Sequence, residues 1–328
     1  MGTREELTRL LADGRVHSGA ALARELGCSR TAVWKQLHQL QSIGLDMSSV
    51  PGRGYKLEAP LELLNPAAIR ENLHESLNLE SLDVLTITDS TSERLRSMPS
   101  PEPGQMRAVL AEYQTGGRGR RAREWLSPFG SGLCLSVSWC FGVVPRDLPA
   151  LSLASGVAVT RALRTLEPVG FGLKWPNDIV AGGGKLGGLL VDVQGESGGP
   201  ISVIIGVGLN FDVSVRLRSD LSPGEGLRPT GLRELVAEKQ ISRNAIAADI
   251  ISEQYSMLVA FADTGFARFV DEWRSYDSMR GKQVTVRIGP EVFSGVAAGI
   301  GADGALLLKE NGRTRQIVSG EVTLRPAQ

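Results

Sequence analysis

The sequence predicts an α+β protein with three domains: an N-terminal winged helix-turn-helix, a central mixed α/β domain and a C-terminal SH3-like β-barrel. Three observations support this prediction. Apolar residues recur at helical spacing up to Ile43, strands and helices alternate from Leu82, and short strands separated by turns follow Ser278. Two prolines in residues 58–66 mark the first linker. We place the domains at residues 1–63, 64–277 and 278–328.

The composition indicates an ordinary globular chain, in which 42% of residues are hydrophobic and 22% are charged. The 36 basic residues balance the 36 acidic ones, so nucleic-acid binding would have to use a local patch. The cysteines are odd in number and unrelated in spacing, which favours reduced thiols and a cytoplasmic location. The three histidines form no ligand pair with them, so we predict no protein-bound metal. We expect neither a signal peptide nor a membrane span, because no apolar run reaches about 18 residues.

Residues 1–57 are expected to form a helix-turn-helix followed by a hairpin. The predicted helices are 5–12, 20–26 and 30–43. Ser18 and Ser29 precede the second and third helices and suit N-caps, and a Pro-Gly-Arg-Gly turn at 51–54 is typical of a wing. Polar side chains of the third helix and the turn could reach phosphates and base edges of DNA. These candidates are Ser29, Arg30, Thr31, Lys35, Gln36 and Arg53. The alternative is a three-helix protein-interaction module.

The central domain is expected to alternate strands and helices. Its predicted strands are 84–88, 108–111, 132–139, 189–193 and 201–205. Its predicted helices are 67–77, a short one from Glu93, 148–166, 232–236, 244–261 and 266–273. Residues 214–230 are polar and are expected to form a loop. Short strands joined by turns are predicted for the C-terminal domain at 284–288, 292–297, 305–308, 316–318 and 321–325.

The loop after strand 108–111 has an unusual composition, because Gly116–Arg123 holds three glycines and four arginines. Glycines let a backbone approach a ligand closely, and guanidinium groups match carboxylate and phosphate oxygens. We therefore predict a phosphate clamp that is mobile when empty, with Trp125 as an apolar lid. Two alternatives are a solvated basic loop and a dinucleotide fingerprint, Gly117-x-Gly119-x-x-Ala122 in form. The residues that follow it make a poor helix start, which argues against the fingerprint.

Polar or small residues follow two other strands. The Asp-Ser-Thr-Ser run at 89–92 lies between strand 84–88 and a helix, where hydroxyls can either bind a polar ligand or cap the helix. Strand 201–205 ends in Gly206–Asn210, whose small residues allow a ligand or another backbone to come close.

Charged and polar residues also interrupt an apolar segment at Lys174, Asn177 and Asp178, and Lys185 follows within a frame of glycines. A proline between Lys174 and Asn177 predicts a broken strand at the edge of the sheet. A lysine oriented by the fold could stabilise a developing negative charge. The alternatives are a structural Lys174–Asp178 salt bridge and a solvated lysine on a flexible hairpin.

Together these motifs resemble the family of bifunctional biotin protein ligases that also repress the biotin operon. The resemblance covers essentially the whole chain, and its motifs occur in the family's order and spacing. They are Val50–Tyr55, Asp89–Thr91, Ala111–Arg121, Ser127–Gly130, Lys174–Asp178, Gly184–Gly188, Gly206–Asn210 and the closing barrel.

The resemblance implies that the central domain is a ligase domain. Biotin's carboxylate would attack the α-phosphate of ATP, which is bound with Mg²⁺, and give biotinyl-5′-AMP and pyrophosphate. A lysine of the biotin carboxyl carrier domain of a carboxylase would then take the biotinyl group.

Residue roles are also implied by the resemblance, with Lys185 and Arg118 as catalytic residues. The implied contacts to biotin or its adenylate are Ser90, Thr91, Ser92, Gln114, Arg118, Gly119, Arg120, Trp125, Lys185 and Asn210. Asn177 and Asp178 would position the nucleotide or the acceptor lysine. Ser92 stands where the family usually has asparagine.

The resemblance further implies that the adenylate acts as a corepressor. It would promote a homodimer that binds operator DNA with two half-sites through the winged helices. Three alternatives are a lipoate-type ligase, a regulator that only senses biotin, and a ligase that has lost DNA binding. The arginine loop and the Lys-Trp-Pro-Asn-Asp motif favour biotin over lipoate.

Overall fold

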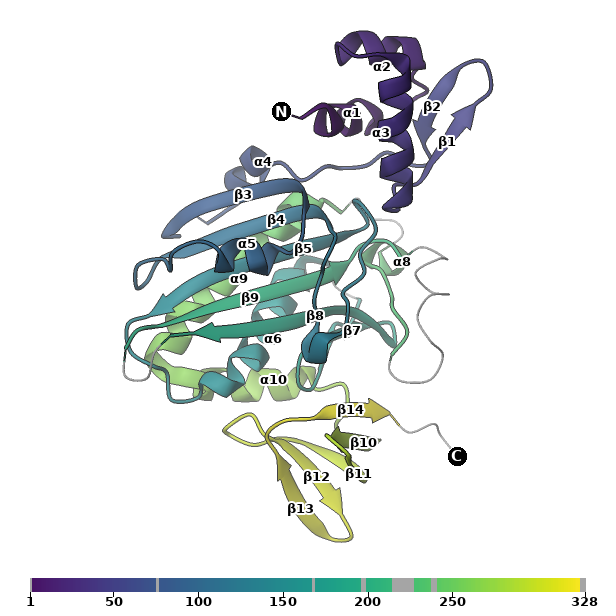
Figure 1. Cartoon of the computed structure of the whole chain (residues 1–328). Helices are drawn as coiled ribbons and strands as arrows, with labels where there is room; N and C mark the ends of the chain where they lie inside the picture. The colour runs from purple at the N-terminus through teal and green to yellow at the C-terminus, as the bar shows by residue number, and fades with distance from the viewer. Residues whose placement is uncertain are drawn as a thin grey trace.

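The described residues form three separate β-sheets, which contain two, seven and five strands. The computed structural model, shown in Figure 1, describes residues 2–74, 77–166, 169–195, 199–213, 227–236 and 241–324. The two-stranded sheet belongs to the N-terminal helical unit, the seven-stranded sheet forms the centre, and the five-stranded sheet is C-terminal. The predicted mixed α/β class is confirmed at this level.

The N-terminal unit is a helix-turn-helix with a hairpin. Its helices are α1 (Thr3–Leu11), α2 (Gly19–Glu25) and α3 (Arg30–Ser42), and its strands are β1 (Met47–Val50) and β2 (Gly54–Leu57). Both predicted N-caps are observed, because the Ser18 hydroxyl accepts from Ala21 N and the Ser29 hydroxyl accepts from Ala32 N, each at 3.1 Å. Gly54 has φ +139° and lies so close to the His17 carbonyl that a side chain would clash there.

The N-terminal unit packs directly on the central one. Phe129 belongs to the central chain segment, yet only 3% of its surface is exposed because it packs into the apolar core of the helix-turn-helix. Its backbone N–H donates to the carbonyl of Ile43 at the end of α3, at 3.0 Å. The two units therefore share a hydrophobic core.

A buried polar network fixes the linker between them. Arg243 is fully buried and pairs with Glu112 at 2.8 Å, while Glu112 also accepts from Leu64 N. Arg243 donates to the carbonyl of Glu62, whose carboxylate in turn accepts from the backbone of Arg243 and the side chains of Ser242 and Asn244. These bonds hold the linker against the start of a long central helix.

The central sheet has the strand order β3-β4-β5-β9-β8-β7-β6, and only β3 and β4 run parallel. Its strands are β3 (Leu79–Thr88), β4 (Met106–Gln114), β5 (Gly132–Phe141), β6 (Gly172–Lys174), β7 (Asp178–Ala181), β8 (Gly184–Gln194) and β9 (Ile201–Asn210). The helical segments are α4 (Pro66–Glu71), α5 (Thr91–Arg96), η1 (Arg120–Ala122), η2 (Leu148–Ala150), α6 (Leu151–Ala162), η3 (Leu163–Leu166), α8 (Leu232–Leu235), α9 (Arg243–Thr264), η4 (Gly265–Phe269) and α10 (Val270–Tyr276). Helices α6 and α9 cover one face of the sheet, and α5 lies on the other (Figure 1).

Helix α9 is the central core helix. Among the described residues, the helical stretch Arg243–Tyr276 is long and apolar enough to cross a membrane, and 56% of its most apolar window is buried inside the protein. Met257, Leu258 and Phe261 on this helix are fully buried, in the same hydrophobic core as the residues of the central sheet. We therefore assign the stretch to the interior of the fold.

Several predicted boundaries differ from the structure. The helix predicted at 148–166 begins and ends as 3₁₀ turns, and the one predicted at 67–77 ends at Glu71. The strands next to the predicted ligand loops are longer than expected, because sheet pairing continues past the apolar runs. Of the polar loop predicted at 214–230, residues 214–226 lie outside the described residues.

The C-terminal sheet has the order β13-β12-β11-β10-β14. Its strands are β10 (Gln283–Ile288), β11 (Glu291–Ile300), β12 (Leu306–Glu310), β13 (Arg313–Ile317) and β14 (Glu321–Leu324). Five short strands were expected and are present, but β13 and β14 do not pair within the described residues, so no closed barrel forms. Val286 and Leu308 are fully buried and join the core of the central domain.

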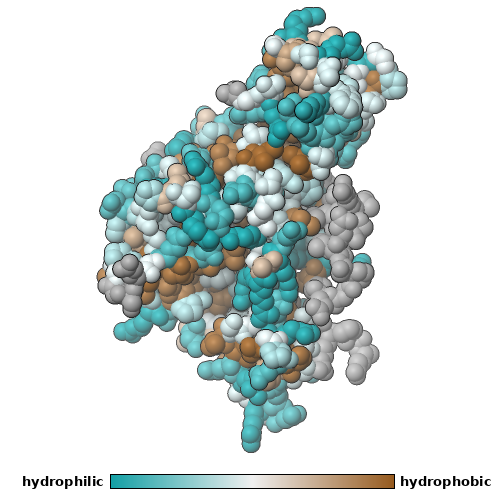
Figure 2. All heavy atoms as spheres, viewed as in Figure 1, coloured by the Kyte–Doolittle hydropathy of each residue, from teal (hydrophilic) through white to brown (hydrophobic). Residues whose placement is uncertain are grey.

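Figure 2 shows that the viewed surface is a mixture of hydrophilic and hydrophobic residues. Brown patches lie at the junction below the helix-turn-helix and near the C-terminal sheet.

Candidate ligand-binding and catalytic site

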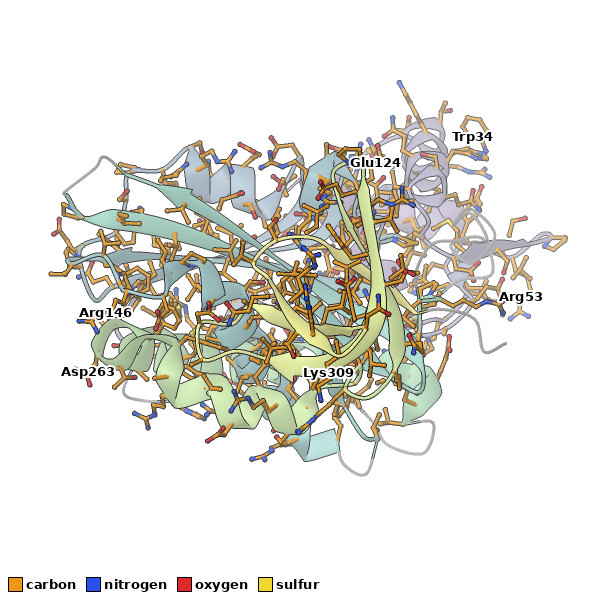
Figure 3. All side chains as sticks on the ribbon, turned by 90° about the horizontal axis from the view of Figure 1, so that it is seen from below. Trp34, Arg53, Glu124, Arg146, Asp263 and Lys309 are labelled. Carbon is orange, nitrogen blue, oxygen red and sulfur yellow. The ribbon has the colours of Figure 1, made fainter. Side chains whose placement is uncertain are left out.

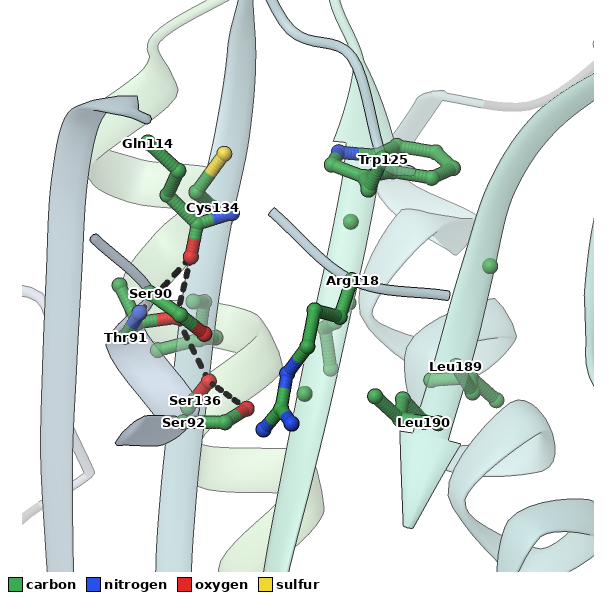
Figure 4. A pocket seen from close by; sticks show the side chains of 15 residues that line it. Ser90, Thr91, Ser92, Gln114, Arg118, Trp125, Cys134, Ser136, Leu189 and Leu190 are labelled. Carbon is green, nitrogen blue, oxygen red and sulfur yellow. Dashed lines mark hydrogen bonds between the residues drawn. The ribbon is translucent and has the colours of Figure 1, made fainter. Parts of the chain in front are cut away.

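A pocket lies on the α5 face of the central sheet, over strands β4, β5, β8 and β9 (Figure 4). Its walls come from strands, from the start of α5, and from the arginine-rich loop with the Trp125 that follows it. The lining residues are Ser90, Thr91, Ser92, Gln114, Arg118, Trp125, Cys134, Leu135, Ser136, Gly188, Leu189, Leu190, Gly206, Val207 and Gly208. Six predicted ligand contacts are therefore gathered in one place.

A chain of hydrogen bonds forms one side of the pocket (Figure 4). Gln114 accepts at Oε1 from the Thr91 backbone N–H at 2.8 Å and lies 3.1 Å from the Thr91 hydroxyl. The Thr91 hydroxyl is 2.7 Å from that of Ser136, which is 3.0 Å from that of Ser92. All three hydroxyl residues are buried, so this polar side is held in place by its own bonds.

Arg118 enters the pocket from the arginine-rich loop and is paired with acidic residues. It forms an ion pair with Glu93 on α5 and lies 3.9 Å from Asp192 on β8. Arg96 pairs with the same two carboxylates, at 2.8 and 2.5 Å. An anionic ligand would compete with Glu93 and Asp192 for Arg118.

The rest of the arginine-rich loop contacts the C-terminal sheet. Arg121 and Arg123 both pair with Glu321 on β14, the first at 3.4 Å. Arg120 donates to the carbonyl of Gly320 at 3.4 Å, and burial together with the nearby Arg121 charge lowers its pKa. The structure describes one arrangement of this loop, and its predicted mobility in the empty protein stays a prediction.

Trp125 lines the pocket and lies close to strands β8 and β9. A Cβ atom at Gly208 would come within 2.4 Å of the indole, and one at Gly188 would lie 3.6 Å from it. The ammonium of Lys185 is 5.9 Å from the centre of a Trp125 ring. Glycines at both positions therefore make room for the indole.

Two lysines share the carboxylate of Asp178, whose side chain is 13% exposed. Asp178 Oδ1 lies 2.6 Å from Lys185 Nζ, and Asp178 Oδ2 lies 2.8 Å from Lys174 Nζ. Burial opposes ionisation of Asp178, but the ammonium groups of Lys185 and then Lys174 outweigh it and hold the pKa of this carboxyl below its usual range. The Lys174–Asp178 salt bridge, which was one alternative from the sequence, is thus observed, and Lys185 pairs with the same carboxylate.

The remaining predicted residues support the walls. The Asn177 side-chain amide donates to the carbonyl of Leu189 at 2.7 Å, and the Asn177 backbone carbonyl accepts from the Leu189 N–H at 2.9 Å. These two bonds fix one wall of the pocket. Asn210 donates to the carbonyl of Lys185 at 3.4 Å. Gly119 bonds through its backbone N–H to the carbonyl of Arg123 at 2.7 Å and closes the loop on itself.

The predicted DNA contacts lie on α3, at its N-cap and in the turn between β1 and β2. Arg30, Thr31 and Lys35 are exposed on α3. Arg53 is exposed in the turn between β1 and β2 (Figure 3). Ser29 serves as an N-cap, and Gln36 accepts from Arg4 at 3.1 Å. These two side chains are thus engaged within the domain.

Several residues of the pocket, and one exposed residue beside the predicted DNA contacts, were not predicted. Trp34 is 53% exposed on α3 beside His38 and lies with Arg53 on the projecting domain in Figure 3. In the pocket, the unpredicted residues with polar side chains are Ser136 and Cys134, and the unpredicted ion-pair partners are Glu93, Asp192 and Glu321. Alternation along strand 132–139 could have identified Ser136, because it faces away from Leu135 and Val137. The acidic partners carry no comparable signal.

The fold and site define a protein in which a helix-turn-helix is joined to a domain that binds a partly polar, anionic ligand. Residues 84–210 match the Biotin/lipoate A/B protein ligase family, 3–56 an HTH domain and 281–325 the Biotin protein ligase C terminal domain. Bifunctional ligase/repressor BirA of Escherichia coli (strain K12) is 35% identical, over 98% of this chain and 97% of the relative. The chain belongs to the family of bifunctional ligase/repressors within the biotin/lipoate protein ligases.

Further relatives agree with this assignment. Bifunctional ligase/repressor BirA of Bacillus subtilis (strain 168) is 32% identical, over 94% of this chain and 93% of the relative. The structure of biotin protein ligase from Aquifex aeolicus in complex with biotin and ATP matches with a TM-score of 0.60 and 27% identity. It covers 76% of this chain and 99% of its own.

Proposed function

We propose that this chain activates biotin with ATP and transfers it to a lysine of the biotin carboxyl carrier domain of a carboxylase. The observation that carries this proposal is a pocket with a buried hydroxyl and amide side that is flanked by Arg118 and Lys185. A ligand with a polar ring and a distant carboxylate fits that arrangement. The full-length similarity to bifunctional ligase/repressors supports the same activity.

In the first step, the biotin carboxylate attacks the α-phosphate of ATP, which enters with Mg²⁺ as substrate. The new bond is carboxyl oxygen to phosphorus, and pyrophosphate leaves. Arg118, Gly119 and Arg120 would hold the carboxylate and phosphate oxygens, and Lys185 would stabilise the charge that develops between them. Biotinyl-5′-AMP then remains in the pocket with its adenine against Trp125.

In the second step, the amine of the carrier lysine attacks the carbonyl carbon of the adenylate, and AMP leaves. The chain needs no nucleophile of its own for either step. Cys134 lines the pocket, but burial raises the pKa of its thiol to about 11, so it stays protonated near neutral pH. Asn177 and Asp178 would position the acceptor indirectly, since Asp178 holds Lys185 and Asn177 holds the Leu189 wall.

The proposed ligand contacts follow the same geometry. Ser90, Thr91, Ser92 and Gln114 would meet the ring of biotin, and Asn210 would act through the backbone of Lys185.

We also propose that the adenylate-bound protein dimerises and represses biotin synthesis genes at operator DNA. The support is an exposed helix α3 that carries Arg30, Thr31 and Lys35, with Arg53 at the hairpin tip. Arginine and lysine there can bind phosphates and guanine edges. Biotinyl-5′-AMP would be the corepressor, and the protein would act in the cytoplasm.

The domains proposed for these roles keep the boundaries at residues 1–63, 64–277 and 278–328. The three sheets support this division, since each lies within one segment. We propose an SH3-like relationship for the last domain on the basis of its five short antiparallel strands, although its edge strands do not pair.

One experiment tests the enzyme. The chain is incubated with ATP, Mg²⁺ and a carrier domain, with either biotin or lipoate, and the carrier mass is measured. Biotinylation supports the proposal, whereas lipoylation alone supports the lipoate alternative. A gel shift on upstream biotin-gene DNA, with and without biotin plus ATP, tests repression. Ligation without any ligand-dependent shift would indicate a ligase that has lost DNA binding.

A further inference from the structure

The hydrogen bonds of the pocket have a definite direction. The Thr91 backbone N–H can only donate, so the Gln114 atom that faces it must be the carbonyl oxygen. That oxygen can only accept, so the nearby Thr91 hydroxyl directs its one hydrogen there, since the opposite choice would place lone pairs against each other at 3.1 Å.

The direction then passes along the chain. Because the Thr91 hydrogen is used, its 2.7 Å contact with Ser136 requires Ser136 to donate. Ser136 in turn accepts from Ser92 across 3.0 Å. The hydroxyl hydrogens of Thr91, Ser136 and Ser92 are therefore all donated within the protein, and the three hydroxyl oxygens keep unused lone pairs.

Those lone pairs can reach a ligand because Gly206 has no side chain. A Cβ at Gly206 would lie 3.1 Å from the Ser92 hydroxyl oxygen and 3.6 Å from that of Ser136. Gly206 itself lines the pocket, so the space in front of these hydroxyls belongs to the ligand site.

From this arrangement we infer that Ser136 is a positioning residue that makes the hydroxyl part of this side, formed by Thr91 and Ser92, an acceptor surface selective for a ligand ring that donates N–H groups. The inference rests on the proposed function, in which that ring is the cyclic urea of biotin. A dithiolane ring such as that of lipoate has no N–H and cannot satisfy these acceptors. Ser136 acts through Thr91 and Ser92, whose hydroxyl hydrogens it orders.

The test compares Ser136→Ala with Ser138→Ala. Ser138 is the matched control because it is buried on the same strand and face but does not line the pocket. Steady-state pyrophosphate release should show a KM for biotin about tenfold higher in Ser136→Ala, the effect of one buried hydrogen bond, with the KM for ATP and kcat within about twofold of wild type. Ser136→Cys keeps a weak donor and should be intermediate, and Ser138→Ala should match wild type.

The direction itself is tested with a cyclic carbamate analogue of biotin, in which oxygen replaces one ring N–H. Wild type should lose at least about 100-fold in kcat/KM on this analogue, because an acceptor then faces acceptors. In Ser136→Ala, the Ser92 hydrogen is free to turn toward the analogue, so the penalty should shrink about tenfold.

An unchanged KM for biotin together with an unchanged analogue penalty overturns the inference. So does an equal loss for biotin and ATP accompanied by a lower melting temperature, which would indicate a merely structural role. Direct titration of the wild-type protein with biotin distinguishes failure of the proposed function from failure of the inference about Ser136. Wild type that binds no biotin refutes the proposed function and this inference with it, whereas binding with an unaffected Ser136→Ala variant refutes the inference alone.

Discussion

Replacing Asp178 with asparagine should destabilise the protein chiefly through Lys174. Only 9% of the Lys174 side chain is exposed, and its ammonium lies 2.8 Å from Asp178. Lys185, the second partner, is 33% exposed and can reach water. Removing one member of a buried ion pair leaves the other charge uncompensated and costs about 3–5 kcal/mol. We expect the free energy of unfolding to fall by about 3 kcal/mol. This is the lower end of that range, because the Asp178 side chain is 13% exposed to water.

A second substitution tests whether the loss of stability comes from the unpaired charge of Lys174. Lys174→Met removes the stranded charge, so Asp178→Asn combined with Lys174→Met should recover most of the loss and lie within about 1 kcal/mol of wild type. Asp192→Asn is the control, because Asp192 pairs with Arg96 near the surface and should change stability by less than about 1 kcal/mol.

Urea unfolding followed by tryptophan fluorescence measures these differences. Trp175 is buried beside Lys174 and reports on this region. An Asp178→Asn variant as stable as wild type would refute the argument. A double variant no more stable than the single one would refute it equally, because the loss would then not come from Lys174.

Four further predictions concern other parts of the chain. Lys185→Met should lower the rate of adenylate formation by about 100- to 1,000-fold without lowering the melting temperature; normal pyrophosphate release contradicts its role. An arginine-specific protease should cut Gly116–Arg123 in the free protein and be blocked by biotin plus ATP, and equal cleavage would exclude loop closure. Burial opposes ionisation of Glu62, but hydrogen bonds from Ser242, Asn244 and the Arg243 backbone hold the pKa of its carboxyl below the usual range. Its stabilising contribution is therefore present above the usual pKa of a glutamate and is lost as the pH falls through the lowered pKa, so Glu62→Gln should show less acid destabilisation between about pH 5 and 3, measured by thermal melts. Removing residues 1–60 should abolish operator binding and retain ligation, but exposure of Phe129 should lower stability; a truncated protein that still shifts operator DNA would contradict the winged-helix assignment.

The sequence predicts those features that follow from local spacing. The helical spacing of Val33, Leu37 and Leu40 corresponds to the buried face of α3, and Ser18 and Ser29 are caps as expected. The sequence predicts Ser90, Thr91, Ser92 and Gln114 as ligand contacts, and the structure places them together in the pocket because β3 and β4 are parallel neighbours whose ends meet. Their roles toward a ligand stay predictions.

Features that depend on distant partners could not be predicted in this way. Glu321 lies about 200 positions from the arginines it pairs with, and nothing around it distinguishes it from other surface carboxylates. Arg243 begins a helix in sequence, yet tertiary packing buries it completely against Glu112. The C-terminal strands were predicted, but whether their edges close depends on pairing between β13 and β14, which local patterns do not encode.

The position of Phe129 has a consequence for protein engineering. A chimaera intended to recognise a different operator would ordinarily exchange the segment before the linker, as if it were a cassette. Here the protein that receives the new segment would keep Phe129, whose side chain packs into the core of the original helix-turn-helix. It would also keep Pro128, which lies against Gly44. The exchangeable unit is therefore discontinuous. It comprises the N-terminal segment and the short Ser127–Gly130 stretch that lies about 70 residues further along the chain, and a graft that omits the second piece would carry a void or a clash at the joint.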